Sequence, residues 1–492
     1  MVPKGCNVGY DVLLFVGRAL FQRHRTVQET LSELAERNIH ISASEINHLG
    51  RKFIFLLARA HRRAAPRIRR EMTLAGGYIL HLDAMHAGDA PVLMSGLDGL
   101  SHIVLGNVKL PSESADSIKP FLESLKERFG VPVACVHDMG RGICNAVAAV
   151  FEGVPDFICH FHFLRDAGND FLEPSYARLR KRLRKHGISS RLHALAREFS
   201  QQLGEDKDIA GRVLEEIIND QGELPDPSLA PLAAAYSLTQ WALAGKQTGD
   251  GYGFPFDRPL ACFAERLLKL NRILPDFIDV FPRGDWRDNK PLYKLVRELS
   301  GVVKDPELRR AFKELRWRGD LFDSLRTAMR IAPSNGNKGL NDDGTPEAGA
   351  DIKSRVLKFR HRLDTDPKLA IDPLCVKLLQ QIDKYNDKLF ADPVTVYTPN
   401  GPIDIQPQRT NNILEQFFRG IRRRHRRQTG NDSIKRRLQT MLADSPLVKN
   451  LDNPRYIDIL LGGKRNLEEL FAELDAQPEE IESDHSEAAE NH

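Results

Sequence analysis

The segment Tyr78-Ile-Leu-His-Leu-Asp83 begins the part of the chain that decides the fold. It is a short apolar run of strand-forming residues that stops at an aspartate. Two further runs of this kind, Val92–Leu97 and His102–Val108, follow it, with the turn signal Asp98-Gly99 between them. The pattern predicts three consecutive strands joined by short connections.

After these strands the pattern alternates between helix and strand. An amphipathic helix is predicted up to Phe129, with Gly130 as its C-terminal signal. The series continues with a buried strand over Val131–Val136 and a small-residue helix over Arg141–Phe151. It ends with a strand over Phe157–Phe161. Three strands followed by helix, strand, helix and strand are the element order of an RNase H-like core. We therefore expect an α/β fold in which helices cover a mixed sheet.

Two aspartates, Asp83 and Asp138, lie where apolar strands are predicted to end. Side chains at such strand ends line the crevice in which α/β proteins bind ligands. On neighbouring strands the two carboxylates would converge, and they would repel unless a hard cation such as Mg²⁺ or Mn²⁺ lay between them. The alternative is that both are structural, with Asp138 capping the helix that starts near Arg141. Asp89 and Asp98 compete for the first role, but both lie in turn-like contexts.

A third carboxylate, Glu415, lies far downstream. The run Val394–Ile405 has the pattern of a β-hairpin with Asn400-Gly401 at its turn, and a capped helix is predicted after it. The buried stripe expected for this helix is Leu414, Phe417, Phe418 and Ile421. Its arginines are Arg419, Arg422, Arg423, Arg424, Arg426 and Arg427. A carboxylate that helps to hold a cation, followed by arginines that hold a nucleic-acid strand, is what a phosphodiester-cutting site requires.

The alternative for this helix is a solvated face on which an exposed Glu–Arg pair contributes about 0.2–0.5 kcal/mol. So dense an arginine cluster repels itself, so binding of a polyanion explains it better.

The N-terminal segment has a helical pattern. Thr26 with Glu29 and Ser42 with Glu45 are two capping boxes, so two helices joined by a short break are predicted. The second helix is expected to end in a basic group, Arg59, His61, Arg62 and Arg63. This arrangement fits a DNA-binding helix-turn-helix, although an ordinary helical hairpin has the same pattern.

The sequence resembles the Mutator-like DDE transposases of bacterial insertion sequences. The resemblance is carried by Asp83, Asp138 and Glu415 together with two short motifs. The motifs are Cys159-His160-Phe161-His162 and Thr410-Asn411-Asn412. The resemblance covers about residues 20 to 440, and the Cys-x-x-His element and the Asn-Asn-x-x-Glu helix are its most specific parts. It implies that Asp83, Asp138 and Glu415 are catalytic metal ligands and that Cys159, His162 and Asn412 support the site. The chain opens at Met1 with a short lead-in, which leaves open whether an upstream DNA-binding element is missing.

The resemblance also implies a domain organisation in which an all-helical insertion interrupts the RNase H-like core before the final glutamate. The expected regions are a helix-turn-helix region over residues 1–72, the first part of the core over 73–175, the helical insertion over 176–393, the second part of the core with the basic helix over 394–445, and a C-terminal segment with an acidic tail over 446–492.

The reaction implied by the resemblance uses two Mg²⁺ or Mn²⁺ ions about 3.5–4 Å apart. One ion would activate water and later a DNA 3′-hydroxyl, and the other would stabilise the leaving oxygen. The element's ends would be cleaved and then joined to target DNA, with no covalent link between protein and DNA. The helix-turn-helix, including Arg59 and Arg62, would read the terminal inverted repeats. The phosphates would be held by Arg419, Arg422, Arg423, Arg426 and Arg427. Joining two ends implies a homodimer or a larger synaptic assembly.

Composition agrees with a polyanionic partner. Lys and Arg number 71 against 67 Asp and Glu, so the net charge is +4. Ten acidic residues and no Lys or Arg fall between Asn466 and His492, which leaves +14 on the residues before them. With no apolar run of about 18 residues, no signal-peptide pattern and only six cysteines, we expect neither a membrane nor a secreted protein but a cytoplasmic one. The resemblance implies a bacterial, nucleoid-associated protein.

Three alternatives stay open. A zinc site is one alternative, because cysteine and histidine are zinc ligands; the candidates are Cys159, His160 and His162, with Cys135 and Cys144. The sequence has no second Cys-x-x-Cys or His-x-x-His pair at metal-ligand spacing. A regulator derived from a transposase would bind DNA without needing all three carboxylates. A nuclease with the same core would cut DNA without joining it.

The insertion contains a basic helix that either tracks DNA or presents a solvated face. Its cationic residues are Arg178, Arg180, Lys181, Arg182, Arg184 and Lys185.

Overall fold

The computed structural model describes residues 2–204, 230–280, 289–331 and 346–477. The chain is α/β and mostly helical, and it divides into two compact units. The first, which we call the sheet unit, comprises Met1–Phe163, Asp343–Asp351 and Tyr385–His492. The second, the helical unit, comprises Leu164–Asp342 and Ile352–Lys384. Among the described residues, no helix is both long and apolar enough to cross a membrane.

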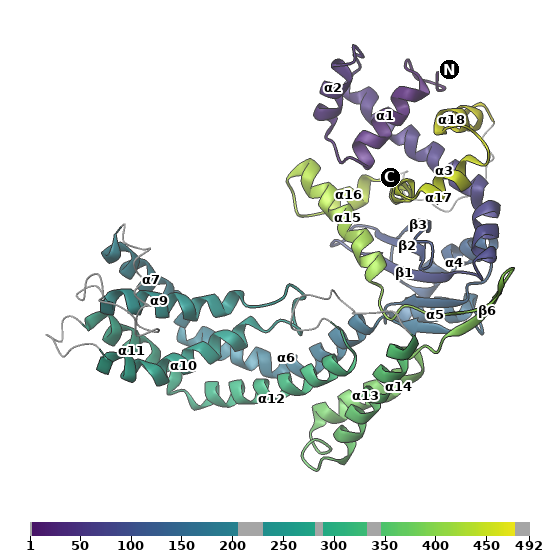
Figure 1. Ribbon diagram of the computed structural model, residues 1–492. Coiled ribbons are helices and arrows are strands. Elements are labelled where there is room, and N and C mark those ends of the chain that lie inside the picture. Colours follow the sequence, from purple (N-terminus) through teal and green to yellow (C-terminus); the bar gives the residue numbers. More distant parts are fainter. Residues whose placement is uncertain (1, 205–229, 281–288, 332–345, 478–492) are drawn as a thin grey trace. The chain divides into compact units, whose positions relative to one another are not determined.

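The sheet unit contains a mixed five-stranded sheet in the order β3-β2-β1-β4-β5 (Figure 1). Its strands are β1 (Ile79–Met85), β2 (Val92–Asp98), β3 (Val104–Leu110), β4 (Ala134–His137) and β5 (Asp156–Ile158). Strand β2 is antiparallel to both β1 and β3, whereas β4 is parallel to β1 and β5 is parallel to β4. All five predicted strands are therefore confirmed.

The predicted bounds of four strands need correction. Strand β1 continues to Met85 and does not stop at Asp83. Strand β3 begins two residues later than expected, because His102 has a φ of +59°, which a strand cannot accommodate. Strand β4 begins only at Ala134. Strand β5 ends at Ile158, before the predicted Phe161, because His160 already starts a helix.

Two helices pack together beside this sheet, α4 (Ala115–Phe129) and α5 (Arg141–Val150). Ser114 caps α4 by accepting the Ser117 amide, and the helix ends at Gly130. Gly130 has a φ of +87°, which glycine adopts without the penalty that a side chain would bring. The predicted end of this helix is confirmed.

Three helices form the N-terminal part of the sheet unit, α1 (Tyr10–Phe21), α2 (Val27–Ala35) and α3 (Ala43–Leu74). Thr26 and Glu29 make both bonds of a capping box, as predicted. Ser42 accepts the Glu45 amide at 3.1 Å, which is one of the two bonds of such a box. The predicted end of α3 at Arg63 is wrong. The helix continues to Leu74 because Ile68 and Met72 extend its buried stripe.

The hairpin before the basic helix is a separate two-stranded sheet of β6 (Val394–Thr398) and β7 (Gly401–Ile405). Thr398 pairs with Gly401, so the turn consists of Pro399 and Asn400, one residue earlier than predicted. Val396 and Ile405 pack in a small apolar cluster with Ile79, Ala134 and Val136 of strands β1 and β4. Helix α15 (Asn412–Thr429) follows and contacts β1, and the short helix α16 (Lys435–Thr440) comes after it.

The C-terminal segment folds back onto the sheet unit as η2 (Ser445–Asp452), α17 (Pro454–Leu461) and α18 (Leu467–Ala476). The Asn450 side chain accepts the Val104 amide at 2.7 Å and donates to the Val104 carbonyl at 2.9 Å, so it occupies a ladder position on the outer edge of β3. Asp475 of α18 accepts the Tyr10 hydroxyl at 2.8 Å and pairs with Lys52 at 3.0 Å. Residues 478–492, which hold most of the predicted acidic tail, lie outside the described residues.

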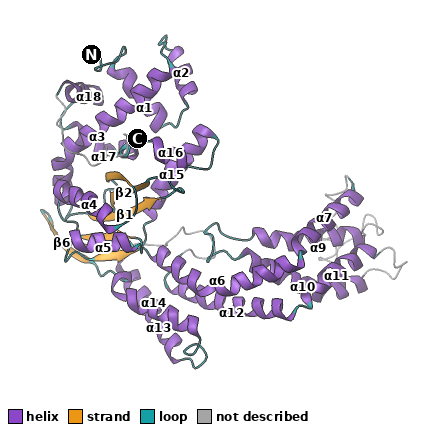
Figure 2. Cartoon of the chain, turned by 180° about the vertical axis from the view of Figure 1, so that it is seen from behind, coloured by secondary structure: helices purple, strands orange, loops and turns teal. Residues whose placement is uncertain are grey.

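The helical unit is built from helices, whereas the strands gather in the sheet unit (Figure 2). Helix α6 starts in the sheet unit and α14 ends there. The helices, with one 3-10 turn, are α6 (His160–His186), α7 (Ile188–Leu203), α9 (Ala230–Ala244), η1 (Gly245–Gln247), α10 (Pro259–Val280), α11 (Lys290–Val303), α12 (Pro306–Ala328), α13 (Pro346–Thr365) and α14 (Pro373–Leu389).

Candidate functional site

Asp83 and Asp138 belong to two neighbouring parallel strands, Asp83 within β1 and Asp138 just after β4. Asp138 follows β4 directly, as predicted. Asp83 lies inside β1 and not at its end, which corrects the prediction, because β1 continues to pair with β2 as far as Met85. Asp138 accepts the Gly140 amide at 3.0 Å. Helix α5 starts without a side-chain cap, so the alternative in which Asp138 caps this helix is wrong.

The Asp83 carboxyl is buried, with 8% of the residue exposed, and it accepts the Ala84 amide at 2.8 Å. Burial raises the pKa of Asp83 to about 8, although the hydrogen bond from the Ala84 amide lowers it. The negative charges of Asp138, Glu415 and Glu113 add to the rise. The other two predicted acids therefore act electrostatically on the buried Asp83 carboxyl within the sheet unit. Glu113, which accepts from His86 at 2.7 Å, is a fourth acid that no sequence pattern pointed to.

A buried polar chain orients the backbone of Asp138. The His137 ring donates from Nδ1 to the Asp138 carbonyl at 2.6 Å, and its Nε2 lies 3.4 Å from Asp156 Oδ2. Lys388 pairs with the same carboxylate at 2.6 Å. Burial by itself lowers the pKa of His137, but the contacts with Asp156 and Cys144 outweigh burial and raise it to about 9. His137 and Lys388 were missed because their roles depend on partners distant in sequence.

Glu415 occupies the first turn of α15, and its Oε1 lies 3.8 Å from Nε2 of His162. The stripe predicted for this helix is confirmed: Leu414, Phe417, Phe418 and Ile421 are all buried. His162 is buried as well, so the Cys-x-x-His element and the Asn-Asn-x-x-Glu helix, which are remote in sequence, meet in the sheet unit.

Asn411, rather than the predicted Asn412, ties this helix to the sheet. Asn411 is fully buried and donates from its side chain to the Leu82 carbonyl at 2.6 Å. Its side-chain oxygen lies 2.8 Å from Nδ1 of His81, and Gln408 contacts the other ring nitrogen at 2.9 Å. Because the Asn411 side chain is turned to β1, α15 starts without a side-chain cap, so the prediction of a capped helix is wrong. Asn412 is the half-buried first residue of the helix.

Cys159 and His160 hold the segment before α15 through main-chain contacts. The Asn411 amide donates to Cys159 Sγ at 3.2 Å, and the His160 amide donates to the Arg409 carbonyl at 2.9 Å. Burial raises the pKa of the Cys159 thiol to about 12, and burial lowers the pKa of His160 to about 3. Cys159 is therefore a protonated thiol and His160 a neutral ring, which suits packing and hydrogen bonding.

The predicted DNA-contacting arginines fall into two groups. Those on α15 are exposed, namely Arg419, Arg422, Arg423, Arg426 and Arg427. Arg426 pairs with Asp432 at 3.3 Å, and Arg427 lies 4.0 Å from Glu29. On α3, Arg59 and Arg62 are only half-buried; Arg59 lies over the Phe55 ring, and Arg62 pairs with Asp444 at 3.5 Å. The α15 group is the stronger cationic surface of the two.

The donor chemistry of Asp83, Asp138 and Glu415 fits a hard divalent cation, because all three supply carboxylate oxygens. Their mutual repulsion also fits, since a bound cation would relieve it. Within the described ranges, however, no three His, Cys, Asp or Glu side chains are gathered closely enough to hold a metal ion. Neither a protein-family model nor a curated protein matches the sequence, so the chemistry of the site is argued from its own residues.

Proposed function

We propose that the protein is a DDE-type transposase that cleaves the ends of a DNA element and joins them to target DNA in a divalent-metal-dependent reaction. The observation that carries this proposal is the placement of three carboxylates in one unit. Asp83 lies on β1, Asp138 directly follows the neighbouring parallel strand β4, and Glu415 lies in the first turn of α15, which Asn411 ties to β1. The element and strand order of the sheet supports an RNase H-like core.

The proposed roles follow from the contacts. Asp83, Asp138 and Glu415 would hold the cation once their side chains rotate toward one another. Bound divalent ions supply an activated oxygen nucleophile and stabilise the leaving oxygen in such reactions. Asn411 fixes the start of α15 against β1, and His137 fixes the backbone of Asp138.

DNA recognition is proposed for two surfaces. The exposed arginines of α15 would hold phosphates beside the acidic residues. Helices α2 and α3 would act as the helix-turn-helix that reads the inverted repeats, and the two capped helix starts support this assignment. Since two DNA ends must be joined, a dimer or a larger assembly is expected.

The test uses the full chain with a duplex that carries the inverted repeats flanking its gene, in the presence of Mg²⁺ or Mn²⁺. We expect Asp138→Asn to lose cleavage and joining while keeping DNA binding. The matched control is Asp116→Asn, because this carboxylate on α4 is 94% exposed and should leave activity unchanged. Full activity of Asp138→Asn would refute the proposal. Cleavage without joining would indicate a nuclease, and DNA binding without either reaction would indicate a regulator.

A further inference from the structure

The helical unit contains a charged groove between α6 and α12, with a volume of about 610 Å³. Its lining residues are Arg178, Lys181, Arg182 and Lys185 from α6, and Glu307, Arg310, Ala311 and Glu314 from α12. In each helix they repeat at intervals of three and four positions, so each set forms one stripe along its helix. Five cations and two carboxylates therefore face one groove.

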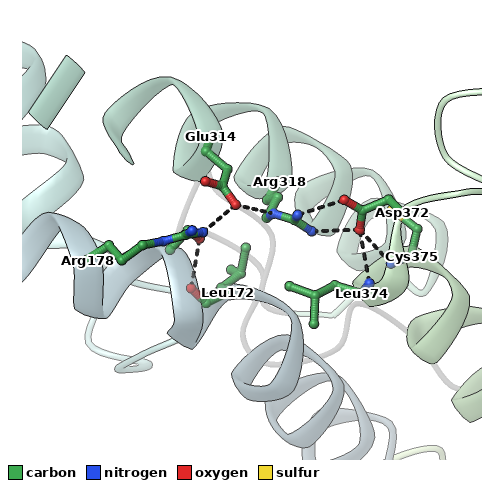
Figure 3. Close-up of polar contacts among 8 residues, drawn as sticks. Leu172, Arg178, Glu314, Arg318, Asp372, Leu374 and Cys375 are labelled. Carbon is green, nitrogen blue, oxygen red and sulfur yellow. Dashed lines mark hydrogen bonds and ion pairs between the residues drawn. The ribbon is translucent and has the colours of Figure 1, made fainter. Parts of the chain in front are cut away.

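The Glu314 carboxylate at one end of the groove is already engaged by two arginines, Arg178 of the groove itself and Arg318 (Figure 3). Glu314 accepts from Arg178 and also from Nε of Arg318 at 3.4 Å. Arg318 is buried and makes a two-pronged contact with Asp372, at 3.0 and 2.8 Å. The Asp372 carboxylate also accepts the amides of Leu374 and Cys375. Glu314 thus belongs to a network of two arginines and cannot neutralise further cations of the groove.

The acids near the other end are engaged in the same way. Glu307 lies 3.6 Å from Arg182. Asp305, which caps α12, pairs with His186 at 2.8 Å and lies 3.9 Å from Arg182. The carboxylates along this groove are therefore paired with Arg178, Arg182 and Arg318.

Three cations of the groove are left over. Lys181, Lys185 and Arg310 are exposed, and none of them has an acidic partner among the residues that the structure describes. Three unneutralised like charges that face one groove repel one another, and an anion bound between them would remove that repulsion. The geometry points to a binding site for the phosphodiester backbone of DNA in this groove. Only the identity of the polymer as DNA rests on the proposed function.

The dimensions agree with a short stretch of one strand. From Arg178 to Lys185 the α6 stripe covers two turns, which is about 10 Å along the helix axis. Two of the free cations, Lys181 and Lys185, lie on this stripe, and Arg310 lines the same groove from α12.

The experiment measures the salt dependence of DNA binding by the full chain, with a duplex of random sequence and with EDTA present so that no metal-dependent reaction takes place. The variant combines Lys181→Gln, Lys185→Gln and Arg310→Gln. The slope of log affinity against log salt should become shallower by about 0.9 per lost phosphate contact, or roughly 2.7 in total. The affinity should fall with it.

The matched control combines Lys358→Gln, Lys368→Gln and Arg272→Gln, which removes the same charges from exposed positions of the helical unit outside the groove. Circular dichroism checks that both variants are folded. An unchanged slope in the groove variant would overturn the inference, and so would an equal change in the control. Because no catalysis is measured, a protein that fails to cleave DNA still supports the groove if the slope changes.

Discussion

The side-chain amide of Asn411 donates a 2.6 Å hydrogen bond to the main-chain carbonyl of Leu82, which joins two residues 329 positions apart. Leu82 directly precedes Asp83, and the Asn411 carbonyl accepts the amide of Glu415 at 3.0 Å. One buried side chain therefore fixes the distance between the strand that carries one acid and the helix that carries another. The positions of Asp83 and Glu415 depend on this contact more than on either element alone.

Replacing Asn411 should loosen this connection. Asn411→Ala removes the bonds to Leu82 and His81 and leaves buried polar groups without partners, so we expect a loss of about 2–4 kcal/mol in local stability. Hydrogen exchange of the β1 amides measures this free energy. Asn412→Ala is the matched control and should cost no more than about 0.5 kcal/mol. Equal effects of the two variants would contradict the assigned role of Asn411.

Two glycines should respond to alanine in opposite directions. A Cβ on Gly142 would lie 1.7 Å from the Glu113 carbonyl oxygen, so Gly142→Ala must push α5 away from the loop that holds Glu113. Gly420 lies within α15 with nothing within 4 Å of its would-be Cβ, so Gly420→Ala should stabilise the helix by about 0.5–1 kcal/mol. Thermal unfolding midpoints should fall for the first variant and rise for the second. A rise or no change for Gly142→Ala would show that α5 is less tightly held than the structure indicates.

Stability should fall in mild acid because of His61. This ring is buried between the Tyr456 hydroxyl, at 2.9 Å, and the Leu105 carbonyl, at 3.0 Å. Burial lowers the pKa of His61 from 6.5 to about 4. The unfolded chain therefore takes up a proton first, and the folded state loses up to about 3 kcal/mol as the pH falls from about 6.5 to about 4.

The measurement for His61 is the urea unfolding free energy near pH 7 and near pH 5. His61→Gln carries no titrating ring, so its loss of stability between these values should be smaller by roughly 2 kcal/mol. The comparison with wild type cancels the carboxylates that titrate in both proteins. The same pH dependence in both proteins would rule out the assigned protonation behaviour.

The arginines of α15 should contribute to DNA binding without contributing to the fold. Arg422→Gln with Arg426→Gln should reduce the salt-dependence slope of DNA binding by about 0.9 for each contact and leave the unfolding midpoint unchanged. Arg455→Gln with Arg465→Gln is the control, because these exposed arginines pair with Glu71 and Glu469 away from α15. If only the control pair changed the slope, the DNA surface would have to be sought elsewhere.

Local signals predicted much of the fold. The stripe of α15, the Thr26 capping box and the glycine after α4 all depend on residues a few positions apart, and all are confirmed. The predicted end of α3 at Arg63 is wrong because the helix runs on through Pro66, whose cost is outweighed by the burial of Ile68 and Met72.

The candidate site was predictable in part. The acids could be proposed from strand ends and helix position, but the choice between Asn411 and Asn412 could not. The two asparagines are chemically identical neighbours, and only the direction in which the chain enters α15 turns Asn411 toward Leu82. His137 and Glu113 were missed for the same reason, since their roles depend on contacts made only in the folded chain.

The contact between Asn450 and Val104 also limits how the chain can be shortened. An uncovered outer strand offers its amides and carbonyls to any other chain and is a common start of aggregation. Asn450 blocks this at β3 by taking the place of a sixth strand for one residue. Truncation before Ser445 would therefore yield an aggregation-prone protein, whatever its effect on catalysis. Truncation after Ala476 would leave the edge of β3 covered by Asn450.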